Sequence, residues 1–465
     1  MSLTTEALAA SIEPFWDREI VPALIEYIKI PSVSVHFDPD WAAHGHMEQV
    51  RRLAVDWLTA HAVPGMVIHD LQLEGRTPLI LVEIPGERDD TVLIYGHLDK
   101  QPEMEGWHAG YGPWTPVLTD GKLYGRGAAD DGYALFAAMA AIHALQGQSR
   151  PRVVLLIEFS EESGSPDLPA YLDQCGALIG QPKLVIALDS GAGDYERLWS
   201  TTSLRGMVNG VVDVRVLEET CHSGMASGII PSSMRIMRQL LDRIEDPLTG
   251  ECRIPELVAP IPPQRVEQAD VAAAILGQRI QHSFSVVPGL QPVSDAPATL
   301  LLNNTWRPSL CVVGQEGLPP MASAGNILRA HTALKLSVRL PPTVDGQAAE
   351  AALARVLTEQ PPYGAEISVT FDQSSTGWDA PPLASWLEEI TREASLATYG
   401  KEPAYVGLGA SIPFMSMLGE RFPAAQFLIT GVLGPLSNAH GPNEFLHIPY
   451  AKKLTTCVAT LLGRV

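Results

Sequence analysis

The sequence predicts an α/β protein in which a mostly parallel sheet, covered by helices, forms one domain and a smaller α+β domain is inserted into it. Three observations lead to this prediction. Short, continuous apolar runs alternate with helical segments in the first part of the chain, strands of alternating polarity follow in the middle, and the first pattern returns near the C-terminus. Continuous apolar runs are typical of strands buried on both faces, whereas alternation is typical of strands with one exposed face.

Composition excludes several classes of protein. The chain has 465 residues, 46% of them hydrophobic, which suffices for a large core and excludes an intrinsically disordered chain. Its formal net charge of −21 argues against nucleic-acid binding, which needs a basic surface. No apolar run reaches the roughly 18 residues of a membrane span, and the acidic N-terminal segment lacks the pattern of a signal peptide. The five cysteines are far apart and form no CxxC pair, so we expect a reduced, cytoplasmic enzyme.

The first domain begins with a predicted helix over residues 7–29, which Pro31 ends. The buried strands of its sheet are predicted at 80–84, 91–97, 153–159, 184–189 and 427–432. Further helices are predicted at 130–146, 383–398 and 449–463. Strands that alternate with helices indicate a sheet covered on both faces. We therefore assign residues 1–206 and 378–465 to one discontinuous domain.

A change of pattern after Arg205-Gly206 marks the inserted domain, residues 207–377. Valines alternate with other residues between 212 and 216, as in a half-exposed strand. The predicted elements that follow are a helix at 232–245, strands near 309–313 and at 333–340, a helix at 347–358 and a strand at 366–371. This β-α-β-β-α-β order is that of a ferredoxin-like unit, which the proline-rich residues at about 246–306 interrupt as an insertion.

Histidine and carboxylate side chains collect at the ends of the apolar runs. They are His97, Asp99, Glu161, Glu162, Asp189 and His440, together with Asp130 at the start of a predicted helix. In open α/β sheets ligands bind at the carboxyl ends of strands, so we expect these side chains to converge. Two imidazoles and several carboxylates without cysteine suit one or two Zn²⁺ or Mn²⁺ ions. Each residue alone is more often a solvated turn or a helix cap, but their joint placement indicates a metal site.

Longer motifs around these residues resemble one known family. The motifs are GHLDKQPEMEGW, DGKLYGRGAADDG, EESGSPDL, ALDSGAG, CHSGMASG, SVRLPP, GASIPF and NAHGPNE. In order and spacing they resemble the cocatalytic-zinc metallopeptidases, which include carnosine dipeptidases, glutamate carboxypeptidase, succinyl-diaminopimelate desuccinylase and aminoacylases. The dipeptidase-like members are closest in motif. The resemblance extends from about residue 30 to residue 450, and it implies a zinc-peptidase-like catalytic domain with an inserted lid that also mediates dimerisation.

The resemblance implies a metal site with two Zn²⁺ ions per subunit, for which Mn²⁺ or Co²⁺ can substitute. Asp130 would bridge the two ions. His97 and Asp189 would complete one site, and Glu162 and His440 would complete the other.

Catalytic roles for two further carboxylates follow from the same resemblance. Glu161 would be the general base, which takes a proton from the metal-bridging water and passes it to the leaving amine. Asp99 would orient His97 and fix its tautomer. The local pattern is compatible, because residues two apart on an extended chain share a face, whereas the adjacent Glu161 and Glu162 point apart.

The inserted domain would contribute to catalysis as well. By the same resemblance, His222 would reach across a dimer to polarise the scissile carbonyl, and Arg339 would hold a substrate carboxylate. Asn326 and Ser411 would line the substrate site. Without the resemblance, His222 is more often a loop histidine, and Arg339 is more often a solvated arginine on a strand.

The expected function is that of a homodimeric dizinc hydrolase. It would cleave the amide bond of a dipeptide or similar substrate with a free C-terminal carboxylate. One alternative is an N-acyl-amino-acid deacylase, such as a desuccinylase or an aminoacylase, because Leu408 replaces a family glutamate that contacts the substrate amine. A second alternative is a catalytically silent, metal-binding homologue.

Overall fold

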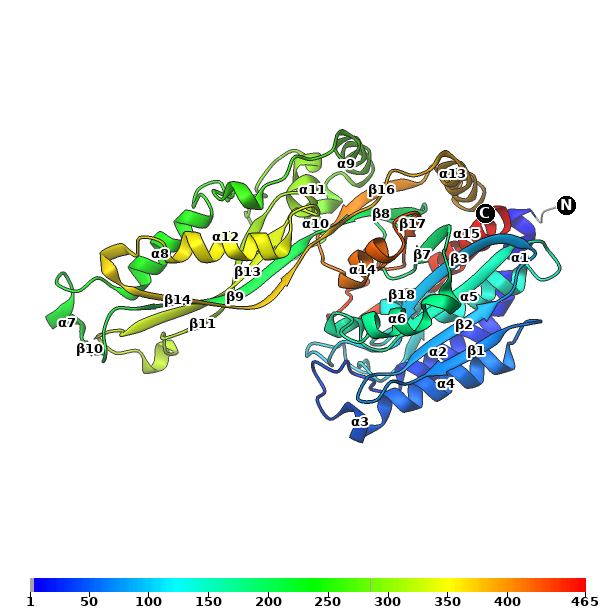
Figure 1. Ribbon diagram of the computed structural model, residues 1–465, viewed down its shortest axis with the longest axis horizontal. Coiled ribbons are helices and arrows are strands. Elements are labelled where there is room, and N and C mark those ends of the chain that lie inside the picture. Colours follow the sequence, from blue (N-terminus) through cyan, green and yellow to red (C-terminus); the bar gives the residue numbers. More distant parts are fainter. Residues whose placement is uncertain (1–3, 285) are drawn as a thin grey trace.

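A nine-stranded sheet forms the centre of the larger part of the molecule (Figure 1). The computed structural model describes residues 4–284 and 286–465. The strands of this sheet are β1 (Val67–Leu71), β2 (Leu79–Ile84), β3 (Arg88–His97), β6 (Pro151–Glu158), β7 (Leu184–Ala187), β8 (Trp199–Leu204), β15 (Trp378–Asp379), β16 (Ala404–Leu408) and β17 (Gln426–Ile429). They lie in the order β1-β2-β6-β3-β7-β17-β8-β15, and β16 pairs with β8.

The centre of the sheet is parallel, and its two sides are largely antiparallel. β3 pairs in parallel with β6 and β7, and β7 pairs in parallel with β17. On one side β2 pairs antiparallel with β6 and β1, and on the other β8 pairs antiparallel with β17 and β15. The predicted α/β fold is confirmed, but the sheet is mixed rather than mostly parallel. The sides were not predicted because β1 is partly exposed along its length and β8 has the polar sequence WSTTSL.

Helices cover both faces of this sheet. They are α1 (Thr5–Phe15), α2 (Val21–Ile28), α4 (His46–Ala60), α5 (Tyr133–Ala144), α6 (Leu168–Ile179), α13 (Ser385–Tyr399), α14 (Pro413–Arg421) and α15 (Ile448–Arg464). Val92 and Ile94 of β3 belong to the core that includes α1, α5 and α15, whereas Leu93 and Tyr95 belong to the core that includes α6 and α14. Alternate residues of one apolar strand thus serve opposite cores. Within residues 4–284 and 286–465, no helix has both the length and the apolar character needed to cross a membrane.

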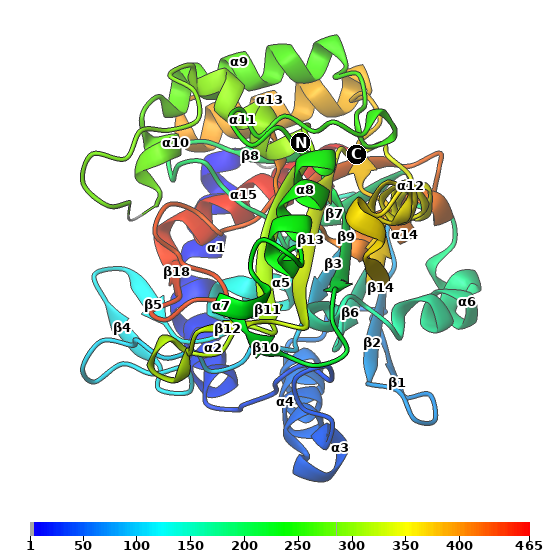
Figure 2. The same cartoon turned by 90° about the vertical axis from the view of Figure 1, so that its left-hand side faces the viewer.

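The smaller part of the molecule is a four-stranded antiparallel sheet with two helices. Its elements are β9 (Gly206–Arg215), α8 (Ser233–Ile244), β11 (Ser309–Glu316), β13 (His331–Leu340), α12 (Gly346–Thr358) and β14 (Glu366–Ser375). The strand order is β11-β13-β9-β14, and both helices pack on the sheet in a separate core. This is the predicted β-α-β-β-α-β unit. It extends away from the larger part along the long axis of the molecule (Figure 1), and it lies in front of the larger sheet in Figure 2.

The helical part of the proline-rich segment between α8 and β11 packs away from the ferredoxin-like unit, whereas Ile254 and Leu257 near its start are buried in the core of that unit. Its helices are α9 (Pro263–Leu276), α10 (Arg279–His282) and α11 (Pro297–Thr305). α9 and α11 contact each other and β16 of the larger sheet. Ala269, Ala272 and Leu302 are buried in the same core as α15. The segment therefore covers one side of the larger sheet, although the chain enters it from the smaller domain.

Candidate metal centre and active site

The carboxyl ends of three parallel strands carry most of the predicted site. His97 is the last residue of β3 and lies opposite Glu158, the last residue of β6. Glu161 and Glu162 follow in a short turn after β6, and Asp189 lies just after β7. Because the three strands are parallel, these side chains meet at one edge of the sheet.

Asp130 reaches this edge from a turn that precedes α5. The turn is π-helical, Ala128–Gly132, and the dihedral angles of Asp130 itself (φ −119°, ψ 91°) are not helical. α5 begins only at Tyr133, so the predicted helix start at Asp130 is wrong. The reason is that a buried side chain binds the backbone N–H groups of this turn.

That side chain is Glu444, which forms a buried ion pair. Three backbone N–H groups donate to its Oε1 at 3.0, 3.3 and 3.4 Å, namely those of Gly127, Ala129 and Asp130. Its Oε2 binds Nη1 of Arg126 at 2.7 Å, and both side chains are almost fully buried. Nη2 of Arg126 also donates to the carbonyl oxygen of His440 at 3.1 Å. One ion pair therefore fixes the turn of Asp130 and the loop of His440 relative to each other.

The five predicted metal ligands come together as two groups that share Asp130. His97 Nε2 lies 3.5 Å from Asp130 Oδ1 and 3.7 Å from Asp189 Oδ2. His440 Nε2 lies 3.0 Å from Asp130 Oδ2 and 3.3 Å from Glu162 Oε2. Each imidazole thus faces a different oxygen of the same carboxylate.

These residues fit a bound cation. His97 Nε2 is buried and, within residues 4–284 and 286–465, has no hydrogen-bond partner. Its ligand atom forms one group with those of Glu161 and Asp189 and a second group with those of Asp130 and Glu162, and within each group the atoms lie within 4.8 Å of one another. Ligand atoms about 2.0–2.2 Å from one ion lie at such mutual distances, and imidazole with carboxylate suits Zn²⁺ or Mn²⁺. Glu161 belongs to the same set, because its Oε2 is 3.9 Å from His97 Nε2.

The electrostatics of the cluster also favour a cation. Burial, followed by the charges of Asp130 and Glu162, raises the pKa of Asp189 to about 8. Burial and the charge of Asp189 raise the pKa of Glu161 well above its ordinary value. Burial lowers the pKa of His440, but the carboxylates of Asp130 and Glu162 outweigh it and raise that pKa to about 11. Full ionisation of these carboxylates would place more negative charge in the cluster than its two imidazoles can neutralise, and a bound cation would supply the missing positive charge.

Asp99 connects His97 with the turn that carries Glu161 and Glu162. Its Oδ1 lies 3.4 Å from His97 Nδ1, and its own backbone oxygen lies 3.2 Å from the same nitrogen. The two carboxylate oxygens accept hydrogen bonds from the backbone N–H groups of Glu161 at 3.1 Å and Glu162 at 3.0 Å. Asp99 therefore orients the turn of both glutamates as well as the histidine, and the spacing of residues along the chain did not predict this contact.

Arg339 and Ser411 meet at the junction of the two domains. Nη1 of Arg339 donates to Ser411 Oγ at 2.9 Å, and burial lowers the pKa of this half-buried guanidinium. A second arginine, Arg205, lies beside it and donates to the carbonyl oxygen of Gly409 at 2.9 Å. Arg205 could not be predicted as a site residue from the sequence, because a single arginine before a glycine carries no chemical signal.

His222 and Asn326 lie apart from the metal cluster of their own chain. His222 is in the short strand β10 (Cys221–His222), which pairs with β12 (Ile327–Leu328). The backbone oxygen of Asn326 accepts a hydrogen bond from Ser223 at 2.9 Å, so the two predicted site residues are neighbours. Figure 1 places β10 at the far end of the smaller domain. The structure therefore does not bring these two residues to the cluster within one chain.

Comparison with curated proteins gives relatives that match along most of their length. The chain is 25% identical over 418 residues to the cysteinylglycine-S-conjugate dipeptidase of Corynebacterium striatum. The aligned region covers 86% of this chain and 88% of the relative. It is 26% identical over 453 residues to the human Beta-Ala-His dipeptidase, and this aligned region covers 92% of this chain and 86% of the relative.

Solved structures share the fold. The dipeptidase Dug1p of Saccharomyces cerevisiae superposes with a TM-score of 0.79 at 21% identity, over 100% of this chain and 99% of that one. Human carnosine dipeptidase 1 superposes with a TM-score of 0.78 at 22% identity, also over 100% and 99%. The model of peptidase family M20/M25/M40 matches residues 93–464, which contain the whole cluster. The chain is therefore a hydrolase of peptide bonds and belongs to peptidase family M20/M25/M40.

Proposed function

We propose that this chain is a metallodipeptidase that uses two Zn²⁺ ions to hydrolyse a dipeptide with a free C-terminal carboxylate. One observation carries the proposal. Two imidazoles and three carboxylates from separate segments meet at the carboxyl edge of the parallel strands, and Asp130 faces both imidazoles. The names of the relatives, which are dipeptidases, support the substrate class.

In this proposal the metal ligands are His97, Asp130, Glu162, Asp189 and His440. The bound ions supply Lewis-acid polarisation of the scissile carbonyl and lower the pKa of the attacking water. Glu161 takes a proton from that water and delivers it to the leaving amine. Burial and the charge of Asp189 raise the pKa of Glu161, which supports this role because a more basic carboxylate accepts a proton from water more readily.

Arg339 and Ser411 would hold the C-terminal carboxylate of the substrate. A guanidinium binds a carboxylate through charge-assisted hydrogen bonds, which strengthen where water is excluded. Arg339 is half-buried and, within the described residues, its side chain bonds to a neutral hydroxyl rather than to a carboxylate. Its charge is thus available to an anionic ligand.

The two alternatives have less support. A deacylase of N-acyl amino acids is not favoured, because the matching relatives are named as dipeptidases. A silent homologue would lack the base or a ligand, yet the five ligands, Asp99 and Glu161 are all present.

We also propose that the enzyme is a homodimer joined through the smaller domain. His222 and Asn326 lie far from the metal cluster of their own chain, which supports an action on the cluster of a second chain. A two-fold axis would provide each cluster with one such pair. The cysteines are free thiols, which supports a reducing, cytoplasmic location.

Metal analysis combined with hydrolysis assays tests this function. The protein loaded with Zn²⁺ should hold two ions per subunit and cleave dipeptides, and a chelator should abolish the activity until Zn²⁺ or Mn²⁺ is returned. Dipeptides amidated at the C-terminus should be poor substrates. Cleavage of N-acyl amino acids without cleavage of any dipeptide would contradict the proposal.

A further inference from the structure

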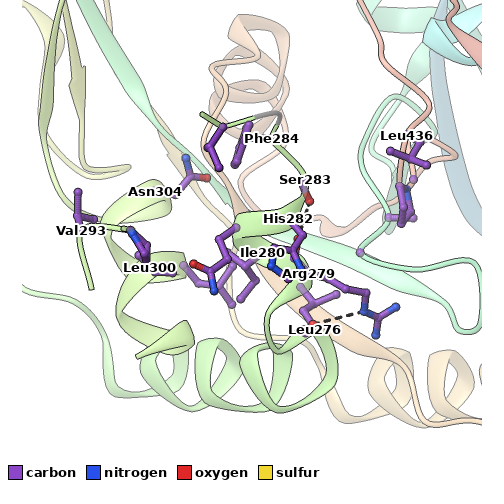
Figure 3. Close-up of a pocket in the computed structure, with 18 of the residues that line it drawn as sticks. Leu276, Arg279, Ile280, His282, Ser283, Phe284, Val293, Leu300, Asn304 and Leu436 are labelled. Carbon is purple, nitrogen blue, oxygen red and sulfur yellow. Dashed lines mark hydrogen bonds between the residues drawn. The ribbon is translucent and has the colours of Figure 1, made fainter. Parts of the chain in front are cut away.

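A pocket with a mainly apolar lining borders the two loops that carry Asp189 and His440, and the proposed hydrolysis does not use it. The cavity has a volume of about 830 Å³. Its walls come from Leu276, from residues 279–284, 286 and 290–293, from α11 and from two loops of the larger domain. Figure 3 shows Leu300 and Asn304 on one side and Leu436 on the opposite side.

The pocket shares walls with the loops that carry the proposed metal ligands. Ala192, which lines it, lies three residues after Asp189, and Leu433, which also lines it, precedes His440 in the same loop. The two loops are paired. The N–H of Ala192 donates to the oxygen of Leu433 at 3.0 Å, and the N–H of Leu433 donates to the oxygen of Ser190 at 3.3 Å. A group bound in the pocket therefore lies beside the loops of both metal sites.

The end of β16 continues this wall. Leu408 packs over Gly191, and its Cδ1 is 3.8 Å from the position that a Cβ on that glycine would occupy. The next residue, Gly409, approaches the pocket residue Asn304 so closely that a Cβ would lie 2.5 Å from Asn304 Oδ1. Leu408 thus contacts the loop of Asp189, and Gly409 contacts the pocket residue Asn304.

The character of the lining indicates which ligands fit. Within the described residues, the lining contains no aspartate or glutamate, so it offers no carboxylate to a cationic group. The guanidinium of Arg279, which also lines the pocket, donates to the carbonyl oxygens of Leu276 and Ile275. Phe284 and Leu436 are 69% and 77% exposed, which is unusual for large apolar side chains that face a cavity. An apolar ligand would remove both from water. The volume lies in the range of small-molecule sites.

We infer that this pocket binds the side chain of the N-terminal residue of the substrate and selects a large apolar one. The inference rests on the proposed dipeptidase function. In a dipeptide the attacked carbonyl belongs to the N-terminal residue, whose side chain is attached to the adjacent carbon. That side chain must therefore lie near the metal centre, and the pocket borders the loops that carry two of the proposed ligands, Asp189 and His440. The C-terminal carboxylate belongs to the other residue and is assigned to Arg339 and Ser411.

Two series of dipeptides test the inference. In the first series the N-terminal residue is glycine, alanine, leucine, phenylalanine or lysine, followed by a constant alanine. In the second series the same residues follow a constant N-terminal glycine. For the Zn²⁺-loaded enzyme we expect kcat/KM to rise about tenfold or more from glycine to leucine or phenylalanine in the first series. It should stay low for lysine and change little in the second series.

Substitutions in the pocket lining test whether the pocket causes the preference for an apolar N-terminal side chain. Phe284→Glu and Leu436→Glu each place a carboxylate on an exposed position of the lining, where the fold tolerates it. Each should lower the ratio of kcat/KM for Leu-Ala to that for Gly-Ala and raise the relative rate on Lys-Ala. Val287→Glu is the matched control, because Val287 is 70% exposed in the same segment but does not line the pocket. It should leave the ratio unchanged.

The outcomes separate this inference from the proposed function. An enzyme that cleaves dipeptides with equal kcat/KM along the first series, or that follows the second series instead, overturns the pocket assignment and leaves the dipeptidase function intact. An equal effect of Val287→Glu and Phe284→Glu also overturns the assignment. If the metal-loaded protein cleaves no dipeptide, the proposed function fails and the pocket assignment falls with it.

Discussion

A buried imidazole nitrogen without a partner is costly, because it gives up its hydrogen bond to water and gains none in return. His97 Nε2 is such an atom, and it faces Asp130, Glu161 and Asp189. Burial opposes protonation of His97, but the carboxylates of Asp130 and Asp99 outweigh it and raise its pKa well above the ordinary value. The metal-free site therefore holds a proton firmly, and a divalent cation must displace it.

Zn²⁺ affinity should consequently increase with pH across the neutral range. His97 and His440 both have raised pKa values, so both carry protons in the metal-free protein near neutrality. Each must lose its proton to become a ligand, and a higher pH favours that loss. Calorimetry in buffers of different ionisation enthalpy counts the protons released on binding. Zn²⁺ binding without proton release would contradict this account.

Substitution of Glu161 should lower the catalytic rate, whereas substitution of Glu162 should weaken metal binding. Glu161→Gln should retain both metal ions and lose roughly 10²–10⁴-fold in kcat, as expected for the loss of a general base. Glu162→Gln should weaken metal binding at the site it shares with His440. Metal analysis of the two purified variants measures the difference. Loss of metal from the first variant and not from the second would exchange the two assignments.

Arg339 should matter only to substrates that carry a free carboxylate. Arg339→Ala should cost roughly 1.5–3 kcal/mol in transition-state binding of a dipeptide, because a charge-assisted hydrogen bond is lost. The same variant should cost little on the C-terminally amidated dipeptide. The ratio of kcat/KM for the two substrates, compared between wild type and variant, measures the interaction between Arg339 and the substrate carboxylate. Equal losses on both substrates would show that Arg339 has a structural role.

At the scale of elements, the turn before α5 depends on a partner from the other end of the chain. Glu444 and Arg126 are 318 residues apart in sequence, yet their ion pair holds both the turn of Asp130 and the loop of His440. β5 (Lys122–Tyr124) and β18 (Phe445–His447) pair antiparallel and bring these segments together. Metal ligands that are held by a second layer of hydrogen bonds lose affinity when that layer is removed.

Glu444→Gln should therefore lower metal affinity about 10–100-fold without touching a ligand. The amide keeps the shape of the side chain but leaves the buried Arg126 without a counter-ion, which also destabilises the fold. Competition with a chelator measures the affinity. Glu83→Gln is the control, because it breaks the partly exposed pair of Glu83 and Arg152 on β2 and β6. Equal affinity losses in both variants would mean a general effect of instability.

Periodicity explains how much of these elements the sequence could predict. The five apolar runs are β2, β3, β6, β7 and β17, because strands buried on both faces must be apolar throughout. β8 and β16 were not predicted, since their residues are polar or partly exposed. The side chains at strand ends were predicted to converge, and they do. The roles of Arg126, Glu444 and Arg205 could not be predicted, because they depend on distant partners that no local pattern encodes.

At the scale of the whole molecule, the arrangement of the two domains means that the role proposed for His222 requires a second chain. The proposed ligands, the base and Arg339 with Ser411 lie in the larger domain or at its junction with the smaller one. His222 lies at the opposite end of the smaller domain, beyond the length of β9 and β13 (Figure 1). A side chain that is exposed there, and that hydrogen-bonds to the N–H of Gly224 at 3.1 Å, has no route to its own cluster.

Mixing two inactive variants tests whether His222 acts on the cluster of a partner subunit. His222→Ala should lose about 10²–10³-fold in rate, as does the removal of one donor to a developing oxyanion. After subunit exchange with Glu161→Gln, each mixed dimer holds one site with an intact base and an intact histidine, so activity should return to about a quarter of wild type. A mixture of Glu161→Gln with Arg339→Ala is the control and should show no activity beyond that of its Arg339→Ala subunits alone, because Arg339 and the base serve the same chain's site. If subunits exchange and the first mixture also stays inactive, His222 does not act across a dimer.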